Sequence, residues 1–87
     1  MDYQKLLARL VKDFTWPNDY MFKFIVPFNP ESLHKVKALF SETATLSHRE
    51  SSNGSYISVT AIQRMEDPDK VIEIYQEAAK IEKIIAL

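Results

Sequence analysis

The sequence contains no cysteine, a single glycine and no hydrophobic run near the ~20 residues that a membrane-spanning helix requires. Without cysteine, the fold has neither disulfides nor thiolate metal ligands, and this absence is typical of a cytoplasmic protein. One glycine excludes a glycine-rich phosphate-binding loop. The first residues lack the basic and apolar regions of a signal peptide. We therefore expect a cytoplasmic protein without a membrane segment, folded as one domain over residues 1–87.

The charges are almost balanced, with 11 Lys and Arg against 12 Asp and Glu and a net charge of −1. Nucleic-acid-binding domains usually carry a basic excess, so this balance argues against nucleic acid as a partner. It does not exclude a local basic patch.

No group of residues has the pattern of a catalytic or metal site. His34 and His48 fall on different predicted elements, and neither has a second ligand at a metal-binding spacing. The serines beside the glycine lack an adjacent base, and turns favour small polar residues for conformational reasons alone. We therefore expect no metal, no cofactor and no enzymatic activity.

The single glycine marks the segment that organises the chain. Asn53-Gly54 lies between two strand-like runs, residues 43–50 and 56–64, and this dipeptide favours a tight two-residue hairpin turn in which both residues have positive φ. Such a turn would place Arg49 opposite Ser58. The polar character of the first run predicts that it lies at a sheet edge.

The remaining pattern predicts a helix at residues 2–13, followed by a core domain at residues 14–87. Two asparagine- or aspartate-proline pairs predict the starts of the later helices, because the first residue caps a helix and proline suits its first turn. The short N-terminal helix must pack over the sheet edge or the core, or dock on a partner. The other elements are predicted as a strand at 20–26, a helix from Pro30 to about Ser41, a helix after Pro68 and a strand at 81–87.

This order is an α-helix followed by βαββαβ. Right-handed crossovers place both later helices on one face of the sheet, and the two most apolar strands belong in its centre. We therefore predict an α+β fold of the ferredoxin-like type, with an antiparallel sheet in the order 4-1-3-2. The predicted core contains Phe22, Phe24, Val26, Leu33, Val36, Phe40, Ile57, Val59, Ala61, Val71, Ile72 and Tyr75.

A sheet with helices on one face leaves its other face open. Alternation places apolar residues on that face, including Met21, Ile25 and Ile62, and such a patch usually has a binding role. The N-terminal helix, a second subunit or a ligand would cover it. The residues predicted to form the ligand or partner surface are Lys23, Arg49, Ser51, Ser52, Tyr56, Ser58 and Thr60.

These features favour a non-enzymatic interaction or regulatory module that acts through the open face or an edge strand, as a homodimer or with a protein partner. An alternative is a sensor of a small anion, an amino acid or an organic acid near Arg49 and Tyr56. Nucleic-acid binding is less favoured, because Tyr56 is the one aromatic residue predicted on the central strands of that face.

The sequence also resembles a known family. Residues 51–59, Ser-Ser-Asn-Gly-Ser-Tyr-Ile-Ser-Val, are similar to the Ser-Ser-x-Gly-x-Tyr-x-Ser-Val hairpin of the YbeD-like family, small bacterial proteins of unknown function. Trp16-Pro17 and Phe22-Lys23-Phe24 resemble its aromatic-proline entry and first strand, and residues 74–77 and 80–82 resemble the end of its second helix and its last strand. The resemblance covers residues 14–87. It implies a ferredoxin-like fold similar to small-molecule-sensing ACT domains, and it implies no catalytic residue.

Overall fold

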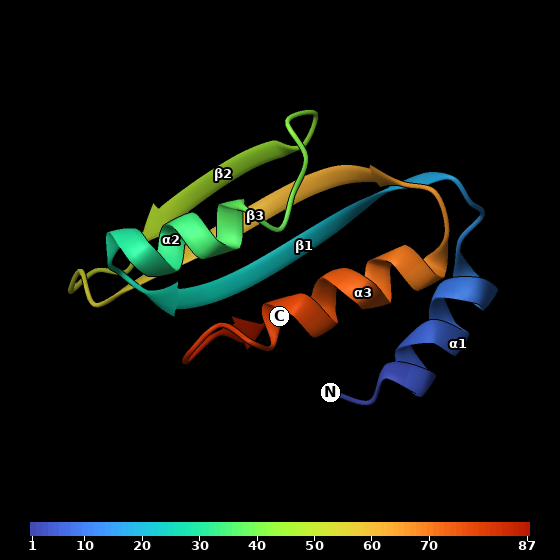
Figure 1. The fold of residues 1–87 in the computed structure, drawn as a ribbon, viewed down its shortest axis with the longest axis horizontal. Coiled ribbons are helices and arrows are strands. Elements are labelled where there is room, and N and C mark those ends of the chain that lie inside the picture. The colour runs from blue at the N-terminus through green and yellow to red at the C-terminus, as the bar shows by residue number, and fades with distance from the viewer.

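A computed structural model describes residues 1–87 and has the predicted topology (Figure 1). Its four-stranded sheet has the order β2-β3-β1-β4, with all neighbours antiparallel. Helices α2 and α3 lie together on one face of that sheet (Figure 1). The prediction of a ferredoxin-like α+β domain with an added N-terminal helix is therefore confirmed. The elements are α1 (Tyr3–Asp13), β1 (Asn18–Pro27), α2 (Pro30–Lys37), β2 (Thr45–Glu50), β3 (Tyr56–Met65), α3 (Pro68–Ala78) and β4 (Ile85–Ala86).

All three helices begin at a side-chain cap. The Asn29 side chain accepts a hydrogen bond from the backbone N–H of Ser32 at 2.8 Å. The Asp67 carboxylate accepts one from the backbone N–H of Lys70 at 3.0 Å. Asp2 caps α1 in the same way. A cap satisfies backbone donors that have no partner inside the helix and contributes about 1 kcal/mol. The caps at Asn29 and Asp67 therefore set the points at which the chain turns from strand to helix.

The register of the β2–β3 hairpin is the predicted one, with Arg49 opposite Ser58, but the turn is different. Within the turn, Gly54 has a positive φ of 74°, whereas Asn53 does not have a positive φ. The loop spans residues 52–55, because Ser51 donates its backbone N–H to the Tyr56 carbonyl at 2.8 Å. The loop has one more residue on each side of Asn53-Gly54 than a two-residue turn, so the register is unchanged.

Several element boundaries differ from the prediction, among them the start of β1, at Asn18 instead of residue 20. Helix α2 ends at Lys37 instead of about Ser41, and β2 starts at Thr45 instead of residue 43. Strand β4 is only Ile85–Ala86 instead of residues 81–87. The cause of the last difference is local: Ile81 turns inward at the end of α3, and Lys83 then adopts a positive φ of 60°, which interrupts an extended strand.

The core consists of 14 buried hydrophobic residues and contains no buried polar residue. All six strand residues of the predicted core are buried, and Phe22 and Phe24 are completely inaccessible. Leu33 of α2 and Phe40, beyond its end, are only partly buried, although both pack against the core. The ring centroid of Phe40 lies 5.3 Å from that of Phe22. The core also includes four residues that were not predicted: Leu10, Met65, Ala78 and Ile81.

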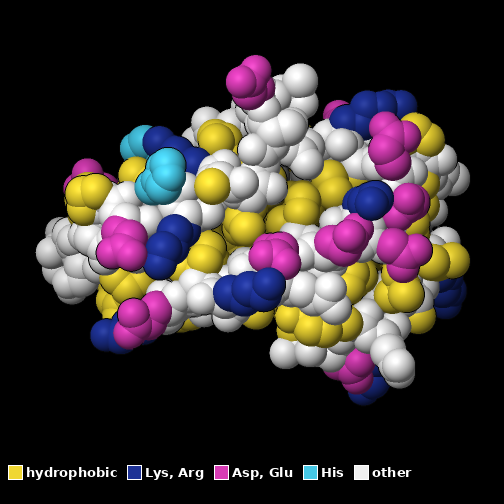
Figure 2. Space-filling view, in the orientation of Figure 1, with side chains coloured by type: hydrophobic (Ala, Val, Ile, Leu, Met, Phe, Trp, Pro, Cys, Tyr) yellow, Lys and Arg dark blue, Asp and Glu magenta, His cyan; other side chains and the backbone are white.

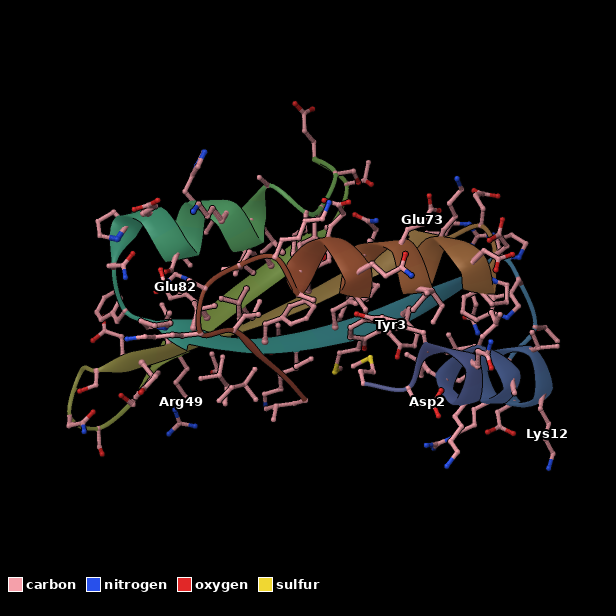
Figure 3. The ribbon with its side chains drawn as sticks, turned by 60° about the horizontal axis from the view of Figure 1, so that its bottom comes forward. Asp2, Tyr3, Lys12, Arg49, Glu73 and Glu82 are labelled. Carbon is pink, nitrogen blue, oxygen red and sulfur yellow. The ribbon has the colours of Figure 1, made fainter.

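Helix α1 packs beside α3 and does not cover the open face of the sheet (Figures 1 and 3). It buries Leu10, whose carbonyl accepts a hydrogen bond from the indole N–H of Trp16 at 3.1 Å. This placement agrees with the prediction that α1 packs on the edge or core. It excludes α1 as the element that covers the open face. None of the helices has both the length and the hydrophobicity to span a bilayer.

Candidate functional site

The open face of the sheet is formed by alternate residues of the strands. On the central pair, Met21 lies opposite Ile62 and Lys23 opposite Thr60. Toward the β2 edge of the sheet, Arg49 of β2 lies opposite Ser58 of β3. The strand alternation therefore groups five of the seven predicted surface residues on one face: Lys23, Arg49, Tyr56, Ser58 and Thr60.

The apolar residues of this face are exposed. Met21 is 59% accessible, Ile62 38% and Ile85 of β4 51%. Ile25, between Ser58 and Ile85 in the sheet, is half-buried. Antiparallel sheets tolerate one solvated face, but that face is then usually polar. The exposed apolar residues on the open face are therefore a feature that packing of the monomer does not explain.

The open face is also basic. It carries Lys23, Arg49 and Arg64 against a single acid, Asp19, which gives a net charge of +2. Since the whole chain has a net charge of −1, the rest of its surface has a net charge of −3. Figure 2 views the side with α2 and α3, where Asp and Glu side chains gather over α3.

The cations of the open face have no ionic partner. The three ion pairs of the structure all join residues within or at the end of α2 and α3. Figure 3 shows Arg49 extending from the sheet on the side opposite to these helices. Unpaired cations beside exposed apolar residues form a surface that can bind both an apolar group and a negative charge.

Of the other two predicted residues, Ser51 lies at the base of the hairpin loop and Ser52 within it, and neither belongs to the strands of the face. The Ser51 hydroxyl donates to the Asn53 side chain at 3.0 Å and accepts from the backbone N–H of Tyr56 at 3.1 Å. The Asn53 side chain also accepts from the backbone N–H of Ser55. These bonds hold the loop in shape, so Ser51 has a structural role in the turn.

A second candidate site, which the sequence analysis missed, is a groove of about 610 Å³ between α1, α3 and the start of β1. Its lining includes Lys5 and Arg9 of α1, Tyr20 of β1 and Tyr75 of α3. The spacing of Lys5 and Arg9, four residues apart on one helix face, is a signal visible in the sequence. The tyrosines, 55 residues apart in the chain, gave no such signal.

The two tyrosine hydroxyls form a hydrogen bond of 3.1 Å at the side of this groove. Tyr75 is 5% accessible. Burial, and then the hydrogen bond with Tyr20, raises the pKa of Tyr75 well above its ordinary value of about 10.

Alkaline pH is expected to destabilise the protein through Tyr75. The unfolded chain ionises this phenol near pH 10, whereas the folded chain keeps it protonated. The contribution of Tyr75 to the free energy of unfolding is therefore fully present below pH 10 and is lost as the pH rises further. The loss approaches about 1.4 kcal/mol per pH unit for this one group. The free energy of unfolding, measured with urea at several pH values from 9 to 11.5, should fall less steeply with pH in Tyr75→Phe than in the wild type. The control Tyr56→Phe, at an exposed tyrosine, should keep the wild-type slope; equal slopes for all three proteins would contradict the assignment.

The topology and the uncovered face define an open-faced ferredoxin-like α+β domain. The chain belongs to the family described as "Protein of unknown function (DUF493)", whose model matches residues 12–87. The match confirms the resemblance to the YbeD-like family seen in the sequence. No curated protein and no solved structure shows significant similarity to the chain.

Proposed function

We propose that the protein is a non-catalytic interaction module that binds an acidic partner protein through the open face of its sheet. The observation that carries this proposal is the exposed stripe of Met21, Ile62 and Ile85 on a face that no element of the chain covers. Burying such a stripe supplies about 25 cal/mol for each Å² of apolar surface removed from water. Polar residues are interspersed with these apolar ones, because the Lys23–Thr60 pair lies between Met21–Ile62 and Ile85 in the sheet. Protein interfaces of the non-obligate kind combine apolar and polar area in this way.

The charge of the face determines the kind of partner. Two copies packed face to face would set one net charge of +2 against another, because each face carries Lys23, Arg49 and Arg64 with a single Asp19. Like charges across an interface suppress association. A partner with acidic and apolar residues side by side complements this face, and an acidic surface also speeds encounter through long-range attraction.

The small-ligand alternative near Arg49 and Tyr56 has less support. Neither residue lines any of the four cavities of the structure. A small molecule needs a concave site that encloses most of its surface, whereas a protein partner can bind a flat face. The geometry of this face therefore favours a protein over an amino acid or a small anion.

The partner can be trapped with a photo-crosslinking residue at position 62, on the open face, and a matched one at position 77, on α3. The proposal expects a protein crosslinked from position 62 alone, which is then purified for direct binding measurements. Lys23→Glu/Arg49→Glu should weaken its binding at least tenfold, with a smaller effect at high salt.

The matched control is Lys70→Glu/Lys80→Glu, which makes the same charge change at exposed positions of the helix side. It should leave the affinity unchanged, and circular dichroism should show both variants folded. The proposal fails if position 62 captures only a second copy of this chain, only nucleic acid, or nothing beyond what position 77 captures. It also fails if the two double variants bind equally well.

A further inference from the structure

We propose that the groove between α1 and α3 binds an amphipathic monocarboxylate of the fatty-acid type. The site is separate from the open sheet face, so this inference does not depend on the proposed protein partner. The groove volume of about 610 Å³ lies within the range of roughly 300–1,000 Å³ that small-molecule sites occupy. Seven of its 11 lining residues are hydrophobic.

The apolar part of the site continues beyond the groove. A second cavity of about 130 Å³ is lined by eight hydrophobic residues and no polar one. Met1 and Tyr75 line both spaces, so the two are neighbours. The small side chains of Ala78 and Ala79 leave this room between α3 and the strands. An unbranched apolar tail that passes the Met1 side chain would extend from the groove into this cavity and leave water.

The polar part of the groove is suited to one negative charge. Lys5 and Arg9 line it one helical turn apart, and neither forms an ion pair within the protein. Asp2 also lines it, but its carboxylate accepts the backbone N–H groups of Gln4 and Lys5 at the helix start. Asp13 lies one turn beyond Arg9 and would repel an anion there. A carboxylate is therefore best placed between Lys5 and Arg9.

The tyrosine pair supplies a further donor. Of the two hydroxyl protons of Tyr20 and Tyr75, one forms the bond between them and the other has no acceptor in the protein. A carboxylate oxygen would accept a hydrogen bond from that hydroxyl, and charge-assisted hydrogen bonds of this kind are stronger than neutral ones. A ligand with several phosphates fits poorly, because Asp2 and Asp13 limit the negative charge that the lining tolerates.

Binding can be followed through Trp16, the only tryptophan, whose ring lies 5.7 Å from that of the groove residue Phe14. The folded protein is titrated with sodium decanoate, decanol and decyltrimethylammonium, all below the concentration at which micelles form. The proposal expects saturable binding of decanoate, at least tenfold weaker binding of decanol, and no binding of the cation. Equal responses to the three compounds, or no response to decanoate, would overturn it.

Variants locate the site within the groove. Arg9→Ala and Lys5→Ala should each weaken decanoate binding about tenfold, whereas Lys12→Ala on the same helix should not, because Lys12 points away from the groove (Figure 3). Ala79→Leu, at an exposed position that lines the apolar cavity, should shift the preference from decanoate toward octanoate or shorter acids. Loss of binding in Lys12→Ala to the same extent as in Arg9→Ala, or an unchanged chain-length preference in Ala79→Leu, would contradict the proposed placement of head and tail.

Discussion

Replacing Phe22 with alanine is expected to lower the free energy of unfolding by about 3–5 kcal/mol. Phe22 is completely inaccessible and lies at the centre of the aromatic cluster of the core. Its ring centroid is 4.7 Å from that of Tyr20 and 5.3 Å from those of both Phe40 and Tyr75. Removing it loses the transfer free energy of the ring and leaves a cavity between β1, α3 and the end of α2.

The size of this effect matters because the domain is small. At about 0.05–0.15 kcal/mol per residue, a chain of this length has a total stability of roughly 4–13 kcal/mol. Urea unfolding followed by circular dichroism measures the change, and Phe28→Ala is the control because Phe28 is 42% accessible. The control should stay within about 0.5 kcal/mol of wild type. A cost below about 1 kcal/mol for Phe22→Ala would show that the core is not packed as described.

The topology could be predicted because several local signals agree. Alternation on β1 and β3 identified the buried faces, and the caps at Asn29 and Asp67 located the starts of the two later helices. Once both crossovers are right-handed, few arrangements of four strands remain. Asn53-Gly54 gave the correct pairing partner for β2 even though its turn type was predicted wrongly.

The positions that were predicted wrongly depend on contacts distant in the sequence or on single backbone angles. Ile81 has the same apolar character as a strand residue, and only its burial at the end of α3 shows that β4 begins later. The positive φ of Lys83 has no signal in the residue type. Similarly, the helical pattern of α1 predicts an apolar stripe but does not identify the surface on which the stripe packs.

The two candidate sites also differ in how far they could be predicted from the sequence. The open face follows from strand alternation, so most of its residues could be predicted, whereas Ser51 and Ser52 could not be separated from it without the loop geometry. The groove exists only because α1 docks beside α3 and brings Lys5 and Arg9 near the Tyr20–Tyr75 pair. No short segment of the sequence contains these four residues together.

Replacing Leu10 with alanine is expected to destabilise the whole domain by about 2–5 kcal/mol. The family match begins at residue 12 and so includes only the end of α1. Nevertheless, Leu10 is 2% accessible within the same core as Phe22, and its carbonyl holds the Trp16 indole. If α1 is part of the cooperative unit, urea unfolding monitored by far-ultraviolet circular dichroism and by Trp16 fluorescence should give one transition, shifted equally for both signals.

The control for this prediction is Val11→Ala, the next residue of the same helix, because Val11 is 62% accessible. It should change the stability by no more than about 0.5 kcal/mol, since alanine is also the better helix former. If α1 instead folded separately from the sheet, Leu10→Ala would remove helical signal in water and leave the main transition where it is in the wild type. The groove would then lose one of its walls without loss of the core fold, so this measurement also tests whether the fold holds the proposed ligand site in place.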